Sequence, residues 1–223
     1  MGAFTGIRRS ASTAHRNRPF ITDIAANRRT EFTGALFEQW VAKTSNWLEA
    51  EFGRELQVHV DLPAHWLWPV MVAALDELEG TLVPMDRADL VMRMGVDPTC
   101  EIPVLAVHDH PMALPFGTQL PEDHVDVFLE VRGGADVRSW GPAHTIPIID
   151  DGDRLWFASE LATETVEPEG RIAVLTRGQA LRTVTEIAAV SVLPWRSTSS
   201  LVIAVDPDAV AGEQVSRTID LRA

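Results

Sequence analysis

The feature that most constrains the fold is a strand–helix–strand unit predicted over residues 57–84. Residues 57–62 read Gln-Val-His-Val-Asp-Leu, and this alternation of polar and apolar side chains is typical of a half-exposed strand. Pro63 can begin a helix in its first turn, apolar side chains then recur at three- and four-residue steps, and Gly80 stands where the helix would end. Residues 81–84 predict the next strand. Two strands joined through a helix pack as parallel neighbours, with the helix on one face of the sheet.

Other segments repeat this rhythm. A hairpin is predicted from residues 19–23 and 29–32 with Asn27 in the turn, and a helix is predicted from Thr33 to Gly53. The other predicted strands are 90–94, 102–107, 171–176 and 201–205, and a second hairpin joins 145–149 to 154–158. Helices are predicted near 125–129, over 179–190 and from 206 to about 215. Residues 111–122 are predicted to form a loop. We therefore expect an α/β fold with a mixed, mostly parallel sheet flanked by helices.

Composition excludes several classes of protein. Cys100 is the one cysteine of the 223 residues, so neither an internal disulfide framework nor a cysteine-based metal cluster can form. No apolar run reaches the roughly 18 residues that span a membrane. Acidic residues outnumber basic ones by 32 to 19, and a negative surface repels nucleic-acid backbones. We expect a cytoplasmic protein that binds neither nucleic acid nor membranes.

Basic residues gather at the start of the chain. Residues 1–29 hold six arginines and a single acid, Asp23, although the net charge of the chain is −13. We expect residues 1–18 to form a basic, flexible segment and residues 19–223 to form a single α/β domain. The segment has three interpretations: a tail for an acidic partner, a mobile terminus, or arginines that dock onto the chain's own acidic body.

Three segments resemble one known family. Residues 32–48, which include Trp-Val-Ala-Lys-Thr-Ser-Asn at 40–46, are similar to the early strand and helix of AMP-dependent synthetases and ligases, the acyl- and aryl-adenylating enzymes. Residues 58–84 resemble that superfamily's strand, proline turn, helix and step into the next strand, and residues 174–181 resemble the strand and helix after its phosphate loop. The 40–46 segment also resembles a set of short bacterial proteins of unknown function, related to the N-terminal part of these enzymes. The resemblance implies the N-terminal subdomain of an acyl-adenylating enzyme in truncated form.

The span that matches the family's phosphate loop departs from its pattern. In the family this loop holds ATP with serines, threonines and glycines and ends in Pro-Lys-Gly, whereas residues 156–170 contain one glycine, no lysine and four glutamates. Each carboxylate a few ångströms from a phosphate would cost on the order of 1–4 kcal/mol. The family's adenine and ribose motifs and its lid domain with a catalytic lysine are not found in the chain. The residues left for a nucleotide site are Ser159, Thr163 and Thr176.

These departures predict a degenerate, non-catalytic domain that acts as a binding or regulatory module, with no cofactor and an unidentified small-molecule ligand. Seven tryptophans in an acidic chain favour an interface, so we expect a homo-oligomer or a protein partner. One alternative is an enzyme fragment that still binds a nucleotide or an acyl ligand. Another is a metal-dependent hydrolase in which His108 and His110, two apart on a strand, share one ion with His124, His144 or an acid.

The other polar residues carry weaker predictions. The acidic turn at 150–153 has the ligands of a hard cation, but such turns are more typical of a solvated hairpin tip. Lys43 lies between two tryptophans of a predicted helix, where a lysine stem usually covers apolar surface. Trp66 and Trp68 are predicted to pack in the core or at an interface, and the alternative is that they stack on a ligand.

Overall fold

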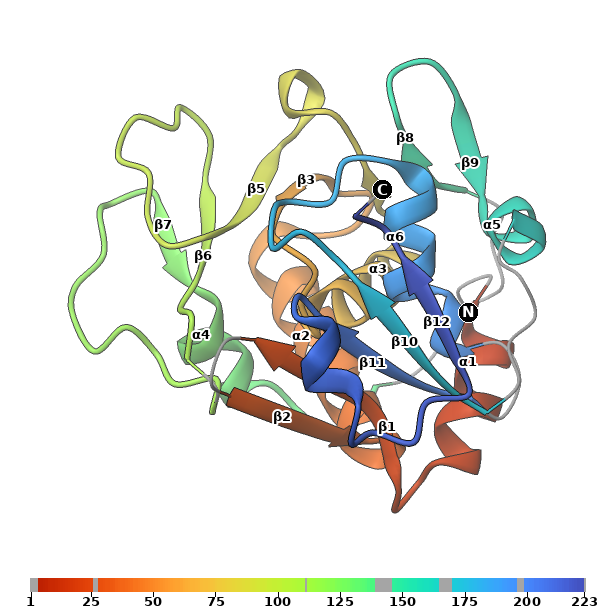
Figure 1. Cartoon of the computed structure of the whole chain (residues 1–223). Coiled ribbons are helices and arrows are strands. Elements are labelled where there is room, and N and C mark those ends of the chain that lie inside the picture. Colours follow the sequence, from red (N-terminus) through yellow and green to blue (C-terminus); the bar gives the residue numbers. More distant parts are fainter. Residues whose placement is uncertain are drawn as a thin grey trace.

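The computed structural model describes residues 4–25, 28–110, 112–138, 146–164, 170–195 and 199–222, with residues 28 and 162–164 described by their backbone alone. Figure 1 shows β-sheets with helices packed against them. The strands are β1 (Pro19–Ala25), β2 (Arg28–Thr33), β3 (Gln57–Asp61), β4 (Thr81–Leu82), β5 (Leu90–Met94), β6 (Val104–Val107), β7 (His124–Asp126), β8 (Pro147–Asp150), β9 (Leu155–Phe157), β10 (Arg171–Leu175), β11 (Ser200–Ala204) and β12 (Arg217–Asp220). The helices are α1 (Thr5–Ala14), α2 (Gly34–Phe52), α3 (Leu67–Leu78), α4 (Val127–Gly133), α5 (Ala158–Glu164) and α6 (Val184–Ser191), with short 3₁₀ turns η1 (Met85–Arg87), η2 (Leu193–Trp195) and η3 (Pro207–Val210).

The strands form two sheets, whereas the sequence predicts one. The five-stranded sheet has the order β12-β10-β11-β1-β2, and the seven-stranded sheet has the order β7-β6-β5-β3-β4-β8-β9. Neighbours pair in parallel throughout, except that β2 is antiparallel to β1 and β9 is antiparallel to β8. The α/β class with mixed, mostly parallel pairing is therefore confirmed, and each antiparallel strand is one arm of a predicted hairpin.

A layer of helices joins the two sheets. Helix α2 contacts β1 and β2 of the five-stranded sheet, α3 contacts β4 and β8 of the seven-stranded sheet, and the two helices pack on each other. In Figure 1 both helices lie behind the five-stranded sheet. One continuous hydrophobic core therefore includes residues of both sheets and of the helices between them.

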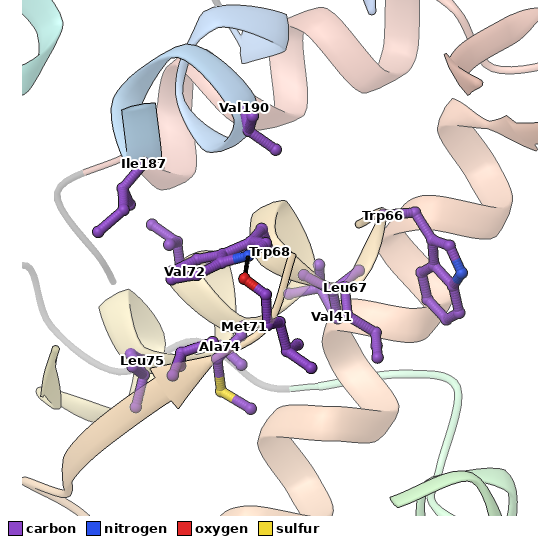
Figure 2. Close-up of a cluster of buried hydrophobic side chains, with 14 of the residues drawn as sticks. Val41, Trp66, Leu67, Trp68, Met71, Val72, Ala74, Leu75, Ile187 and Val190 are labelled. Carbon is purple, nitrogen blue, oxygen red and sulfur yellow. Dashed lines mark hydrogen bonds between the residues drawn. The ribbon is translucent and has the colours of Figure 1, made fainter. Parts of the chain in front are cut away.

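Helix α3 is the centre of this core. All twelve of its residues are buried, and ten of them are apolar, the exceptions being Asp76 and Glu77, which agrees with a helix that is surrounded by protein. Figure 2 shows Leu67, Trp68 and Leu75 of this helix among other buried side chains. The indole of Trp66, just before the helix, stacks on the ring of Phe128 at 5.8 Å between centroids. Among the described residues, no helix combines the length and the hydropathy needed to cross a bilayer.

Local signals in the sequence set the ends of α2. Thr33 is the N-cap, and its side chain accepts a hydrogen bond from the backbone N–H of Leu36 at 3.2 Å. Gly53 follows the helix with a φ of +86°, which favours glycine. The predicted hairpin before α2 is also present as β1 and β2, but its predicted turn residue Asn27 lies outside the described residues.

Three predicted helices differ in the structure. Pro63 does not begin α3, because the helix begins at Leu67 and Pro63 instead forms a β-bridge with Ala180. The residues between that bridge and Thr183 are not helical, and α6 begins at Val184 and not at residue 179. The last predicted helix is only the short η3, and the chain continues into β12, which pairs with β10. In these segments, pairing with distant strands determines the secondary structure, although the local sequence pattern favours a helix.

The N-terminal segment does not form the flexible tail that the sequence predicts. Thr5–Ala14 forms α1, which packs on α2, α3 and η2. Arg8 is fully buried and binds Glu38 and Glu77. Of the three interpretations of the basic segment, the contacts of Arg8 agree with the one in which its arginines dock onto the acidic body of the chain.

Candidate functional site

A cavity of about 220 Å³ lies where β3, β4 and β8 end, at their carboxyl ends, and the segment that enters α6 closes its other side. Such positions at the carboxyl ends of parallel strands are where α/β folds place their ligands. The apolar part of the lining includes Val60, Trp68, Leu82, Ile149, Leu181, Val184 and Ile187, and the polar side chains are His59, Asp150, Asp151 and Arg182. Figure 2 shows Trp68 of α3 on the side of the helix that faces α6, toward Ile187 and Val190.

Two rings in the cavity wall are held by backbone carbonyls. The Nδ1 atom of His59 lies 3.0 Å from the carbonyl oxygen of Val83, so Nδ1 donates, and in the neutral ring the Nε2 atom then carries the lone pair. The indole N–H of Trp68 donates to the carbonyls of Leu62 and Pro63, at 3.3 and 3.0 Å. The wall therefore offers a fixed aromatic surface and one imidazole acceptor.

The tip of the β8–β9 hairpin borders the cavity, and its backbone donors are already used. The N–H of Gly152 donates to the carboxylate of Asp150 at 3.0 Å. The N–H groups of Asp153 and Arg154 donate to a single oxygen of Asp151, at 3.1 and 2.9 Å. Backbone N–H groups in a turn are what a phosphate-binding loop presents to its ligand. Here the turn's own carboxylates occupy the place of an anion.

Further contacts hold these two carboxylates. Arg87 binds Asp150 with both terminal nitrogens, at 2.7 and 2.8 Å. The indole N–H of Trp156 donates to Asp151 at 2.7 Å, and this bond, together with the backbone donors, lowers the pKa of Asp151 below its ordinary value. Asp151 is therefore a carboxylate near neutral pH, and the hairpin tip presents negative charge to the cavity mouth.

The structure places the predicted nucleotide residues at two separate elements. Ser159 and Thr163 lie on α5, which packs on β9 and α6, and the side chain of Thr163 lies outside the described part. Thr176 follows β10 of the other sheet, is 2% exposed, and has a hydroxyl without a hydrogen-bond partner among the described residues. Neither Ser159 nor Thr176 is among the residues that line the cavity between β3, β4 and β8.

The predicted phosphate span is partly a helix. Glu160 lies in the first turn of α5, accepts a hydrogen bond from the backbone N–H of Phe157 at 2.9 Å, and pairs with Arg154. The Phe157 N–H and then the Arg154 guanidinium lower the pKa of Glu160. Glu164 has only its backbone described, and Glu167 and Glu169 lie outside the described residues.

The two candidate metal ligands lie next to each other after β6. The rings of His108 and His110 are 5.7 Å apart between centroids, and His108 stacks on Phe116 at 4.7 Å. The Nδ1 atom of His108 bonds to backbone carbonyls, and the Nδ1 atom of His110 accepts from the N–H of Met112. Their third-ligand candidate His124 has its Nε2 bonded to the N–H of Asp97 at 3.0 Å.

The described residues contain no group of three or more His, Cys, Asp or Glu side chains placed to hold a metal ion. His144, the other predicted third ligand, lies outside them. The shared-ion site at His108 and His110 therefore stays a prediction from the sequence.

Sequence reasoning missed the residues that line the cavity. From the sequence, His59 is predicted only as one position of an alternating strand, and Asp150 and Asp151 only as part of a solvated turn or as ligands of a hard cation. A local signal for the turn exists, because aspartates next to Gly152 favour side-chain bonds to their own backbone. No local signal places His59 opposite Arg182, since they belong to elements more than a hundred residues apart.

No protein-family model and no curated protein matches the chain. Among solved structures, an acyl-CoA synthetase from Brucella canis aligns with a TM-score of 0.72 and 14% identity, over 99% of this chain and 47% of its own length. The coronafacic acid ligase of Pectobacterium brasiliense, in a mutant form, aligns with a TM-score of 0.70 and 8% identity, over 99% and 50%. The N-terminal domain of FACL13 from Mycobacterium tuberculosis aligns with a TM-score of 0.67 and 11% identity, over 96% and 62%.

The chain thus spans about half the length of the first two of these enzymes. Identities of 8–14% show likeness of fold alone. The resemblance noted in three segments of the sequence agrees with these structures, and the chain has the fold of the N-terminal part of adenylate-forming enzymes.

Proposed function

We propose that this chain is a non-catalytic binding module that holds a small molecule in the cavity between β3, β4, β8 and α6. The observation that carries the proposal is the hydrogen bonding of the hairpin tip, where the carboxylates of Asp150 and Asp151 accept hydrogen bonds from the backbone N–H groups of residues 152–154. An adenylating enzyme must stabilise the negative charge of a triphosphate with free donors. A tip whose donors are filled by its own carboxylates offers no such donors, so a triphosphate is disfavoured in this cavity.

The cavity favours a ligand with an apolar body. Its volume of about 220 Å³ is below the roughly 300–1,000 Å³ typical of ligand pockets, so it suits a molecule much smaller than ATP. Trp68, Leu82 and Ile187 supply apolar contact, and His59 supplies one acceptor. We infer a small molecule that carries at least one hydrogen-bond donor and no phosphate chain.

Thermal unfolding of the full chain with single compounds tests the proposal. The probes are 1-hexanol, benzyl alcohol, hexylamine, benzylamine, AMP, and ATP with Mg²⁺, because each of the four small compounds carries a hydrogen-bond donor and no negative charge. A compound present at a hundred times its Kd stabilises by about 2.7 kcal/mol, which for a domain of this size raises the Tm by roughly 5–10 °C. We expect such a shift with one or more of the four small probes and none with ATP and Mg²⁺.

A cavity-filling variant locates the binding. Val184 lines the cavity at the start of α6, so Val184→Phe should abolish the shift. Val96 is 45% exposed and lies outside the lining, so Val96→Phe is the matched control and should leave the shift unchanged. A saturable shift with ATP and Mg²⁺ that exceeds every other probe, or no shift with any of the four small probes, would contradict the proposal.

A further inference from the structure

A second hollow of the molecule, remote from the cavity, is a groove of about 660 Å³. Its walls come from the last turns of α2, the loop over 115–122, β7 and the first turns of α4. Apolar side chains form its floor and one side: Trp47, Leu120, Val125 and Leu129. Leu129 is 57% exposed, which is unusual for a leucine beside other apolar side chains. The groove therefore offers apolar surface that nothing in the described chain covers.

The rim of the groove has one sign of charge. The exposed carboxylates of Glu51, Glu122 and Glu130 line it, together with Asp126, and no lysine or arginine of the described residues does. Asp126 is buried and already accepts from the backbone N–H groups of Phe116, Phe128 and Leu129. The three glutamates are thus the carboxylates that face solvent at the rim.

The backbone adds to this negative potential. The last turn of α2 carries no basic side chain, and the carbonyl end of a helix is the negative end of its dipole. Apolar surface with a uniformly acidic rim is complementary to a cationic, partly apolar partner.

A buried donor in the groove lacks an acceptor. His124 is nine-tenths buried and lines the groove. Its Nε2 accepts from the N–H of Asp97, so the ring proton is on Nδ1, and Nδ1 has no hydrogen-bond partner among the described residues. A buried N–H without an acceptor is costly, and a carbonyl oxygen is the kind of group that it lacks.

The strand that carries His124 is an edge. β7 is the last strand of the seven-stranded sheet in the described part of the chain, with β6 as its neighbour, and the backbone N–H of His124 already donates to the carbonyl of Pro121 at 3.0 Å. An open strand edge beside apolar pockets is the arrangement with which proteins bind extended peptides, because the peptide adds as a further strand and its alternate side chains enter the groove.

We propose that this groove binds an extended basic peptide segment of a partner protein. The peptide's apolar side chains pack on Leu129 and Val125, its lysine or arginine side chains pair with Glu51, Glu122 and Glu130, and its backbone lies along β7. This site is separate from the cavity of the proposed function and does not depend on it.

Fluorescence anisotropy with two labelled hexapeptides tests the proposal on the full chain. The cationic probe is acetyl-Lys-Leu-Arg-Val-Lys-Leu-amide, and the control probe, acetyl-Glu-Leu-Gln-Val-Glu-Leu-amide, keeps the apolar residues but reverses the charge. We expect saturable binding of the cationic probe that weakens as salt rises from 50 to 300 mM, and no binding of the acidic probe.

Variants on the rim and the floor separate the two contributions. An exposed ion pair strengthens binding by a factor of up to about five. The triple variant Glu51→Gln/Glu122→Gln/Glu130→Gln should therefore weaken binding of the cationic probe about tenfold or more. The charge-matched control Asp86→Asn/Asp153→Asn/Asp208→Asn changes exposed acids outside the groove and should leave binding unchanged. Leu129→Ser should weaken binding severalfold, whereas Leu155→Ser, at a leucine 47% exposed on β9, should not.

Three results would overturn the proposal. The first is no saturable binding of the cationic probe up to 1 mM peptide. The second is equal binding of both probes, or binding unaffected by the rim variant. The third is self-association of the chain, measured by sedimentation, that the rim variant abolishes, because a second copy would then occupy the groove.

Discussion

The Nη2 atom of Arg8 lies 2.6 Å from the Oε1 atom of Glu77, and neither side chain is more than 2% exposed. Arg8 also binds Glu38 at 2.8 Å, and Ser45 donates to the second oxygen of Glu77 at 2.9 Å. This buried network joins α1 to α2 and α3, and it fixes the basic segment on the acidic body.

Removal of the buried Arg8 should destabilise the packing of α1 on the rest of the fold. Arg8→Ala leaves the carboxylate of Glu77 buried without its closest cation, and breaking a buried ion pair in this way costs about 3–5 kcal/mol. Arg9→Ala, at an exposed position of the same helix, should cost less than about 1 kcal/mol. Urea unfolding of both variants measures the difference. Equal losses would mean that α1 is not held by the Arg8–Glu77 pair.

The same network predicts a pH dependence of stability. Burial raises the pKa of Glu77 to about 7 from 4.5, although Arg8, Ser45 and Arg138 act in the opposite direction. Because the folded pKa lies above the unfolded one, this group stabilises the fold fully below pH 4.5, and that contribution is lost as the pH rises through 7. Over this range the unfolding free energy should fall by roughly 3 kcal/mol through Glu77 alone.

Glu77→Gln isolates this contribution, since glutamine does not titrate. The free energy of unfolding, measured by urea at several values between pH 4.5 and 8, should decline more steeply in the unmodified chain than in the variant. Parallel curves for the two proteins would show that Glu77 does not titrate in this range.

Close backbone contact between α1 and α2 predicts opposite effects for two glycines. A methyl group at Gly34 would overlap the carbonyl oxygen of Ser12, so Gly34→Ala must push α1 away and should cost more than about 1 kcal/mol. Gly6 lies in α1 with nothing near its Cβ position, so Gly6→Ala should stabilise by about 0.5–1 kcal/mol. The Tm of the two variants, measured by thermal unfolding, should shift in opposite directions relative to the unmodified chain. A higher Tm in Gly34→Ala would refute the close contact between α1 and α2.

A capping box starts α6, the helix that closes the cavity. Thr183 accepts from the N–H of Glu186, and Glu186 accepts from the N–H of Thr183 at 2.8 Å. Thr183→Ala should therefore cost about 1 kcal/mol, whereas Thr185→Ala, exposed in the same turn, should change stability by less than half of that. Chemical unfolding compares the two variants, and an equal effect would argue against the cap.

Features set by neighbouring residues could be predicted from the sequence. The cap at Thr33, the glycine after α2 and both hairpins depend on residues within a few positions of one another. Strong alternation or helical spacing likewise identified β3, β5 and α3, although α3 begins four residues after Pro63.

Features set by distant residues could not be predicted. The docking of α1 depends on Arg8 and Glu77, which are 69 residues apart, and only the folded chain brings them together. β12 is exposed and polar except at Ile219, so its sequence carries little strand signal until β10 pairs with it. The cavity combines His59 with Arg182, and its charge depends on how Asp150 and Asp151 turn back onto their own backbone.

Exchange of labelled pyrophosphate into ATP tests the central claim most directly, because it detects adenylate formation without knowledge of the second substrate. With Mg²⁺, ATP and a panel of carboxylic acids that includes hexanoate, benzoate and phenylalanine, we predict exchange no faster than in the absence of protein. Exchange that saturates with one acid and disappears in Val184→Phe, but persists in Val96→Phe, would contradict the account.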